Sequence, residues 1–435
     1  MVILGKSAEN LHFFCEFGNF SVKRFANMDF FLYLCMFLCA SAKFNPRKST
    51  MVSDQKKKRV LVTYIEAGFG HITTANSIAD AIEGLHDSGI EVIRKYMFHD
   101  DSILRKLELG FIRDVKWANM FPLHNYLQMA ATHIFGIHNS LPFVVSLLYR
   151  AERRKYLELL SEIKPDIIID THYLTSYFAV EYRDTIDPHV KVVTYDPDNS
   201  VHNWWNIRVD KFVVNCMIAF HDGLKHDFTR KQLMVVPFVT RKEIMDVTES
   251  KAYYRDKYGL PADRFIVMVA AGGYGRSGMS RVVDALLLVR HPITIVAICG
   301  TNKRLYNRLQ RIKTKVPAHI DLRPYEFVDK VYELNRASDV LLTKGGPNAM
   351  LDSALMGVPI GVFYCASEIE YISTHLFTDV LNCGRSFWQA WRIVKWINEC
   401  VVTPQILDIY VDGAHAVRAE GNGAEKIAQF VQTYE

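Results

Sequence analysis

The stretch DVLLTKGGPNAMLDSALMGVPIGVF, residues 339–363, contains a complete strand–turn–helix–strand unit. Its apolar run at 340–343 predicts a strand, and Gly345-Gly346-Pro347 predicts a turn that leads into a helix. A second apolar run at 359–363 predicts the next strand. Such alternation of short apolar runs with amphipathic stretches is typical of a parallel sheet covered by helices.

The same alternation runs along the chain from Arg59 onward. A charged segment, residues 240–264, separates two halves, which we place at 59–245 and 246–435. The sequence therefore predicts an α/β protein with two Rossmann-like halves. The expected strands of the first half are 60–65, 90–96, 166–171, 190–195, 211–215 and 233–238, and those of the second half are 265–270, 293–299, 320–327, 340–343 and 359–363.

Length and composition agree with two globular cores. The chain has 435 residues, of which 49% are hydrophobic and 23% charged. Its net charge of +5 is too small to indicate a nucleic-acid partner. The eight cysteines have no paired spacing typical of zinc sites, which favours reduced thiols without a zinc site or a disulfide framework.

Residues 1–58 have a different character from the rest of the chain. The apolar run at 30–42 is 13 residues long, shorter than the roughly 18 to 20 residues that cross a bilayer. It resembles a signal-peptide core followed by the small residues Ala40-Ser41-Ala42, whereas Met51 resembles an ordinary cytosolic start. Three interpretations of this leader stay open: an upstream extension that the folded protein does not use, a targeting signal, or a membrane anchor.

Each half begins with a strand, a glycine-rich turn and a helix. In the first half Gly68 and Gly70 precede His71; in the second, Gly273-Tyr274-Gly275-Arg276-Ser277-Gly278 matches the G-x-G-x-x-G pattern. Glycines at such turns let main-chain N–H groups and a helix N-terminus approach an anion. The two turns predict a phosphate site in one half and a second binding site in the other.

A dinucleotide is the first candidate ligand for the G-x-G-x-x-G loop. Binding it requires an acid about 20 residues further on, to hold the ribose. Gly300 to Lys303 stand there instead, and the first turn lacks a third glycine. We therefore favour a diphosphate ligand and keep an NAD-dependent oxidoreductase as an alternative, together with a catalytically silent nucleotide-sugar-binding protein.

Several ordered motifs make the interpretation more specific. They are Ala67-x-x-Gly70-His71, PDIIIDTHYLTSY, VVTYDPDNSVHNWW, AAGGYG, CGTNK and the block from YEFVDKVYELNRASD to LMGVPI. Together they resemble the glycosyltransferases that include monogalactosyldiacylglycerol synthase and the processive diacylglycerol glucosyltransferases. The resemblance runs from about residue 59 to the C-terminus, and 339–361 is its most specific part.

This resemblance implies a GT-B fold, in which two facing Rossmann-like domains bind acceptor mainly in the first and nucleotide sugar in the second. A last helix over 415–433 would cross back to the first domain. Glycines 272, 273 and 275, with Arg276 and Asn302, would bind the diphosphate of a UDP-sugar. Phe327 and Val328 would face the uracil, Asp352 would hold the ribose, and Glu368 or Glu370 would lie near the sugar hydroxyls. Lys344, Gly345 and Gly346 belong to the same donor site.

Three departures from the family pattern concern the donor site. Asp352 stands where the family usually has the longer Glu, and Asn348 replaces a glycine of the turn. The segment VVPFV at 235–239 lacks the usual glycine before its proline. These departures leave the donor sugar undecided.

The expected chemistry begins with removal of a proton from an acceptor hydroxyl. His71, at a helix N-terminus, is the candidate base, and Asp196 is expected to orient it or to bind acceptor. Asp196-Pro197-Asp198 also matches the metal-binding D-x-D pattern, but in a GT-B protein helix dipoles and main-chain amides take that role, so we expect no metal and no other cofactor. A single displacement inverts the anomeric centre.

Residues 103–155 alternate aromatic and basic residues, with eight bases against three acids. The pattern predicts peripheral contact with an anionic membrane; a pair of core helices with solvated faces is the alternative. The whole sequence then predicts a membrane-associated enzyme, facing the cytosol, that moves a hexose from UDP to a lipid hydroxyl. Diacylglycerol is the expected acceptor, and a lipid-linked intermediate is the alternative.

Overall fold

The computed structural model describes residues 57–65, 69–85, 89–98, 105–106, 150, 152–272, 278–365 and 367–434. Of residues 69 and 70 it describes the main chain only. The leader up to residue 56 and nearly all of the expected membrane segment 103–155 therefore lie outside the described residues.

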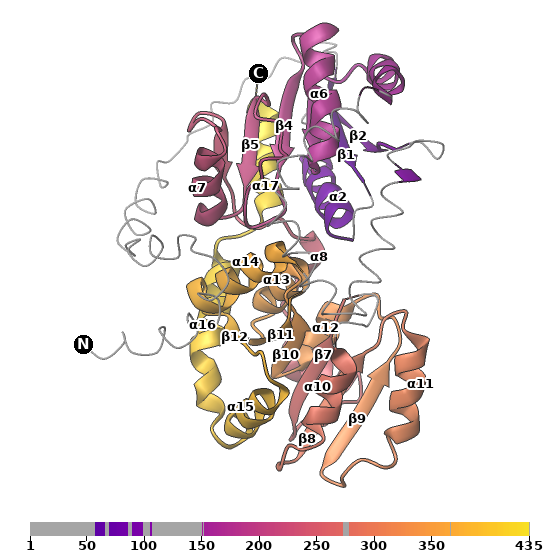
Figure 1. Ribbon diagram of the computed structural model, residues 1–435, viewed down its shortest axis with the longest axis vertical. Helices are drawn as coiled ribbons and strands as arrows, with labels where there is room; N and C mark the ends of the chain where they lie inside the picture. Colours follow the sequence, from indigo (N-terminus) through magenta and orange to yellow (C-terminus); the bar gives the residue numbers. More distant parts are fainter. Residues whose placement is uncertain are drawn as a thin grey trace, which may run out of the picture. The chain divides into compact units, whose positions relative to one another are not determined.

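The first sheet has six parallel strands in the order β2-β1-β3-β4-β5-β6 (Figure 1). Opposite residues such as Val62 and Ile169 define the register of the neighbouring strands β1 and β3. The strands are β1 Lys58–Tyr64, β2 Ile90–Tyr96, β3 Ile167–Asp170, β4 Lys191–Tyr195, β5 Lys211–Val214 and β6 Leu233–Val235. The helices of this half are α2 Phe69–Glu83, α6 Tyr173–Thr185, α7 Met217–Lys225 and α8 Lys242–Met245.

The second sheet also has six parallel strands, in the order β12-β11-β10-β7-β8-β9. Its strands are β7 Phe265–Ala270, β8 Ile293–Ile298, β9 Ile320–Tyr325, β10 Val340–Lys344, β11 Ile360–Tyr364 and β12 Gly384–Ser386. The helices are α9 Lys251–Lys257, α10 Met279–Leu286, α11 Lys303–Ile312, α12 Val331–Ala337, α13 Pro347–Leu355, α14 Glu368–His375, η2 Leu376–Val380, α15 Ala390–Val402, η3 Pro404–Leu407, α16 Asp408–Ala419 and α17 Gly423–Thr433.

Both sheets are buried on both faces, as parallel sheets are. In β1 the side chains of Val60 and Val62 belong to the core beneath α2, whereas Leu61 between them belongs to the core on the opposite face. This period of two within an entirely apolar run explains why the strands could be located from short hydrophobic stretches.

Two strands end two or more residues earlier than expected, and one strand was not expected. The strand predicted at 233–238 ends at Val235, because the Phe238 carbonyl accepts a hydrogen bond from the Gly423 N–H at 3.0 Å instead of extending the sheet. The strand predicted at 320–327 ends at Tyr325. The short edge strand β12 was missed because its three residues are too few for a periodic pattern.

The C-terminal helix expected over 415–433 is two helices, α16 and α17. Gly421 separates them with φ +89°, a left-handed conformation that favours glycine, and the Asn422 side chain then caps α17. Helix α17 returns to the first half, where Ile427 and Val431 share a core with residues of α2 and β1 (Figure 1). The last helix therefore crosses between the halves, but over a shorter range than predicted.

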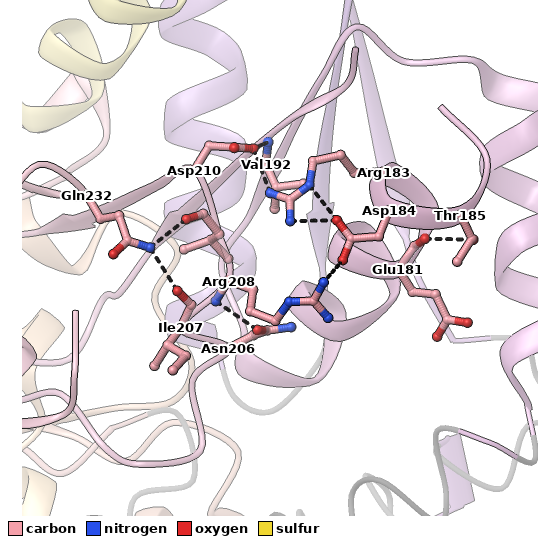
Figure 2. Close-up of polar contacts among 11 residues, drawn as sticks. Glu181, Arg183, Asp184, Thr185, Val192, Asn206, Ile207, Arg208, Asp210 and Gln232 are labelled. Atoms are coloured by element: carbon pink, nitrogen blue, oxygen red, sulfur yellow. Dashed lines mark hydrogen bonds and ion pairs between the residues drawn. The ribbon is translucent and has the colours of Figure 1, made fainter. Parts of the chain in front are cut away.

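A network of charged residues joins the amino ends of β4, β5 and β6 (Figure 2). The Asp210 carboxylate accepts from the Val192 N–H at 2.7 Å and from Arg183 of α6 at 3.0 Å. The Gln232 side chain donates to two main-chain carbonyls of the neighbouring loop, Ile207 and Val209. Since ligands of open parallel sheets bind at the carboxyl ends of the strands, this network at the opposite edge is structural.

Candidate active site

Each sheet has a point where its strand order reverses. In the first sheet β1 lies between β2 and β3, and in the second β7 lies between β8 and β10. Connections that leave such neighbouring strands in opposite directions open a crevice at the carboxyl ends of the strands, which is where open α/β sheets bind ligands. Both glycine-rich turns of the sequence follow the strand at such a point, β1 or β7.

His71 lies in the first turn of α2, directly beyond β1. Its Nδ1 atom is 2.8 Å from the main-chain carbonyl oxygen of Thr171, which follows β3. A carbonyl can only accept a hydrogen bond, so Nδ1 is the donor, and in the neutral form of the ring the lone pair lies on Nε2. The crevice between β1 and β3 thus holds an imidazole in the tautomer that can accept a proton.

A second histidine, which the sequence analysis did not assign, lies beside the first. The ring of His172 is 4.9 Å from that of His71, centroid to centroid, in an edge-on arrangement. The Nδ1 atom of His172 accepts from the Leu174 N–H at 3.2 Å and so caps α6. Burial, with the neighbouring His71, holds the pKa of His172 well below 6.5, so this ring is neutral. Its position directly after β3 is the signal that could have identified it.

Asp196 and Asp170 end adjacent strands and are fully buried. Asp170 accepts from the Thr194 hydroxyl at 2.9 Å, and Asp196 accepts from the Asp198 N–H at 2.9 Å. Burial raises the pKa of both carboxyls well above the ordinary value for Asp. The D-x-D pattern therefore forms a local turn. Among the residues that the structure describes, no three His, Cys, Asp or Glu side chains gather as a metal site.

In the second sheet, the main chain after β7 approaches the end of β10. Gly272 has φ +72°, and a Cβ at this position would lie 3.6 Å from Cε of Lys344. Lys344 forms an ion pair with Glu370, and the two side chains are only 19% and 11% exposed. Gly272, Lys344 and Glu370, which the expected site includes, thus lie close together. The described residues do not include Gly68, Gly273, Gly275 or Arg276. The structure therefore describes no distance between His71 and the loop at 273–277.

The Gly345-Gly346 turn joins β10 to α13. A Cβ on Gly345 would lie 2.5 Å from the Thr374 hydroxyl oxygen and 2.7 Å from the Glu370 carbonyl oxygen, so only glycine fits this approach to α14. Gly346 precedes Pro347 at the first position of α13, and the first turn of this helix contains no acidic residue. Its free N–H groups and positive dipole end are suited to an anion.

Asp352, on α13, has a partner that the sequence did not suggest. The Arg241 guanidinium donates from Nη2 to Oδ2 of Asp352 at 3.3 Å, with side chains 32% and 20% exposed. Burial raises the pKa of Asp352 to about 6, although Arg241 acts in the opposite direction. Arg241 was missed because 111 residues separate the pair along the chain.

The remaining predicted donor residues follow other strands of the second sheet. Asn302, after β8, accepts from the Leu305 N–H at 3.0 Å and caps α11. Phe327, after β9, is 59% exposed, whereas Val328 packs against the core. Glu368 is exposed at the start of α14.

Two parallel six-stranded sheets of this kind, with a last helix that returns to the first, define the GT-B fold. The comparison with solved structures agrees. The chain is similar to Acinetobacter baumannii MurG, with TM-score 0.55, 11% identity and coverage of 86% of this chain and 99% of that one. It is also similar to Phytolacca americana UGT2 complexed with UDP-2fluoro-glucose and pterostilbene, with TM-score 0.55, 11% identity and coverage of 88% and 100%. The UDP co-structure of S. aureus MnaA gives TM-score 0.56, 12% identity and coverage of 87% and 96%.

Sequence comparison identifies more specific relatives. The chain is 20% identical over 323 residues to a processive diacylglycerol beta-glucosyltransferase of Bacillus licheniformis, covering 74% of this chain and 81% of the relative. It is 25% identical over 338 residues to a probable chloroplastic monogalactosyldiacylglycerol synthase of Glycine max, covering 74% and 61%. No family model matches the chain. These relatives favour a glycosyltransferase over an oxidoreductase.

Two further observations concern the expected thiols and membrane contact. All five cysteines within the described residues are free: Cys216, Cys299, Cys365, Cys383 and Cys400. The described part of the chain contains no helix with the length and apolar character needed to span a bilayer.

Proposed function

We propose that this chain is an inverting glycosyltransferase that moves a hexose from a UDP-sugar to the hydroxyl of diacylglycerol. The observation that carries the proposal is the hydrogen bond from Nδ1 of His71 to the Thr171 carbonyl, because in the neutral form of the ring it leaves the lone pair to Nε2. The relatives named for diacylglycerol glucosyl transfer and for monogalactosyldiacylglycerol synthesis support the substrate class.

In the proposed reaction, the acceptor hydroxyl oxygen attacks the anomeric carbon of the donor. The bond between that carbon and the β-phosphate oxygen breaks, UDP leaves, and the hydroxyl proton passes to Nε2 of His71. A single displacement from an α-linked donor gives a β-glycoside. Asp196, at the end of β4, is proposed to contribute to the acceptor side of the same crevice.

On the donor side, the N-termini of α10 and α13 are proposed to hold the diphosphate. Neither helix has an acidic residue in its first turn, which leaves the positive dipole ends available. Gly272, Gly273, Gly275 and Arg276 would complete this anion site, and stabilisation of the leaving charge by fixed main-chain donors requires no metal. Lys344, Asn302 and the turn at 345–346 border it.

The other parts of the nucleotide sugar are assigned to side chains that follow neighbouring strands. Phe327 and Val328 are proposed to face the uracil, Asp352 the ribose diol, and Glu370 or Glu368 the sugar hydroxyls. We further propose that the chain divides near residue 245 into an acceptor part and a donor part. Residues 103–155 would contact an anionic membrane at its cytosolic face.

The test is direct. Purified protein is incubated with detergent-dispersed diacylglycerol and each radiolabelled UDP-hexose, with EDTA in place of metal, and the lipids are separated. Labelled glycolipid with one donor is the expected result. Absence of labelled lipid with every donor, with and without added metal, would contradict the proposal. Label on a lipid-linked intermediate alone would favour that acceptor, and binding of UDP without turnover would favour a silent nucleotide-sugar-binding protein.

A further inference from the structure

The contact between Arg241 and Asp352 joins two segments that are distant in the sequence. Arg241 precedes α8, beyond the last strand of the first sheet, whereas Asp352 lies on α13 of the second half. The separation of Nη2 and Oδ2 is 3.3 Å. A partly buried carboxylate with a guanidinium partner can be held in one orientation more firmly than one that faces water alone.

The guanidinium of Arg241 is itself held on several sides. It lies over the ring of Tyr332, at 5.5 Å from the ring centroid, and donates from Nη1 to the Glu243 carboxylate at 3.0 Å. Tyr332 is only 4% exposed, so the ring is a fixed platform. Stacking on an aromatic face together with two charged hydrogen bonds restricts the planar guanidinium to few orientations.

The main chain beside Arg241 is fixed as well. Asn422 accepts from the Thr240 N–H at 3.2 Å and donates to the Thr240 carbonyl at 2.9 Å. Arg418, on α16, donates to the carbonyls of Met245 at the end of α8 and Leu355 at the end of α13, each at 2.6 Å. Helix α8, which follows Arg241, and helix α13, which contains Asp352, are thus both bonded to α16.

We propose that Arg241 is a positioning residue of the donor site, which orients the Asp352 carboxylate toward the ribose diol of the bound uridine nucleotide. This inference rests on the proposed function, because it requires UDP to bind with its ribose beside α13. The proposed role of Arg241 also offers a reason why Asp stands at 352, where the similar glycosyltransferases usually have Glu. The shorter Asp side chain reaches the ribose only if a neighbouring residue fixes its direction.

The pair predicts a specific kind of selectivity. A carboxylate that accepts from both ribose hydroxyls discriminates against a nucleotide that lacks the 2′-hydroxyl, since one charged hydrogen bond is then lost. UDP and 2′-deoxy-UDP differ in that hydroxyl alone. Their affinity ratio therefore reports on the ribose contact, whereas a general loss of packing or of phosphate binding lowers both affinities together.

The experiment measures UDP and 2′-deoxy-UDP binding by calorimetry for the wild type and four variants. We expect the wild type to prefer UDP by about tenfold, and Arg241→Met and Asp352→Asn to reduce the preference to below about threefold. Arg241→Lys, which keeps the charge, should recover part of the preference. Arg385→Met is the matched control, because Arg385 also lies over an aromatic ring, that of Phe387 at 5.9 Å; it should leave the preference unchanged.

The outcomes separate the two proposals. If the wild type binds neither nucleotide, the proposed function fails and the inference fails with it. If the wild type binds UDP and Arg241→Met keeps the full preference for UDP, or increases it, the inference alone is wrong. Thermal unfolding identifies a variant that does not fold; if Arg241→Met is one, Arg241→Gln takes its place and is expected to lose the preference likewise.

Discussion

The Nδ1 atom of His71 and the carbonyl oxygen of Thr171 lie 2.8 Å apart, across the crevice between β1 and β3. A main-chain carbonyl holds the imidazole in one tautomer without a carboxylate, because it can only accept a hydrogen bond. The two buried carboxyls nearby, Asp170 and Asp196, form their own hydrogen bonds with Thr194 and with the Asp198 N–H. The tautomer of the His71 ring thus depends on the backbone of one strand end.

The first prediction concerns this histidine. His71→Ala should lower kcat by about 10²- to 10⁴-fold, because general-base catalysis contributes a factor of this size. UDP affinity should stay within about twofold, since we propose that His71 acts on the acceptor and not on the nucleotide. The measurements are initial rates with labelled donor and calorimetry with UDP. His189→Ala, at an exposed loop histidine, is the control and should keep full activity. Equal rates for His71→Ala and wild type would remove His71 from the mechanism.

The second prediction concerns pH and stability at Asp352. The pKa of Asp352 in the folded chain is about 6, above the ordinary value of 3.8, because burial disfavours the charged form. Its contribution to stability is therefore complete below pH 3.8, is lost as the pH rises through 6, and stays lost above. A pKa shift of this size corresponds to a change of at most about 3 kcal/mol in the free energy of unfolding. Asp352→Asn removes this titration.

Asp352→Asn should consequently be more stable than wild type at pH 8, by at most about 3 kcal/mol, because the pKa of about 6 already includes the opposing effect of Arg241. The advantage should disappear, and reverse, toward pH 4. Urea unfolding at pH 4, 6 and 8 measures it. A difference between variant and wild type that does not change with pH would mean that the carboxyl does not titrate in this range.

A matched pair of glycines provides the third prediction. Gly345→Ala places a methyl group 2.5 Å from the Thr374 hydroxyl oxygen and should displace the turn that begins α13. Gly346→Ala, one residue further on, has its nearest neighbour at 3.7 Å and should be tolerated. We expect Gly345→Ala to lose about 1–3 kcal/mol of stability and at least about tenfold in UDP affinity. Similar affinities for the two variants would exclude the turn from the donor site.

Among the described residues, the sequence predicted eleven of twelve strands, because most of them are short, largely apolar stretches between turn residues. It also placed His71 and the 345–346 turn just after strands, since glycine patterns mark the ends of strands. It could not predict Arg241 or the Thr171 carbonyl as parts of the site. The partners of these two groups lie in other elements, and hydrogen bonds between distant segments leave no periodic signal in one sequence. His172 was missed although its place just after β3 was a usable signal.

The same limit applies to the break between α16 and α17. The resemblance to GT-B proteins suggested one helix over 415–433, whereas Gly421 and Asn422 end one helix and begin another. Glycine followed by a capping residue is a recognisable signal, but an apolar pattern that continues on both sides conceals it. The consequence is functional, because the break is where the chain returns to the first half.

The last prediction tests this return. A Cβ on Gly423 would lie 2.0 Å from the Pro237 carbonyl oxygen, and the Gly423 N–H donates to the Phe238 carbonyl at 3.0 Å. Two backbones in such contact have no room for a methyl group, so Gly423→Ala must separate the segment after β6 from the start of α17. We expect a loss of about 1–3 kcal/mol in urea unfolding. Gln429→Ala, at an exposed position of α17, should change stability by less than about 0.5 kcal/mol. If Gly423→Ala is as stable as Gln429→Ala, the close contact between residues 237–238 and Gly423 is not needed for stability. The positioning of Arg241 through Thr240 and Asn422 then loses its structural basis.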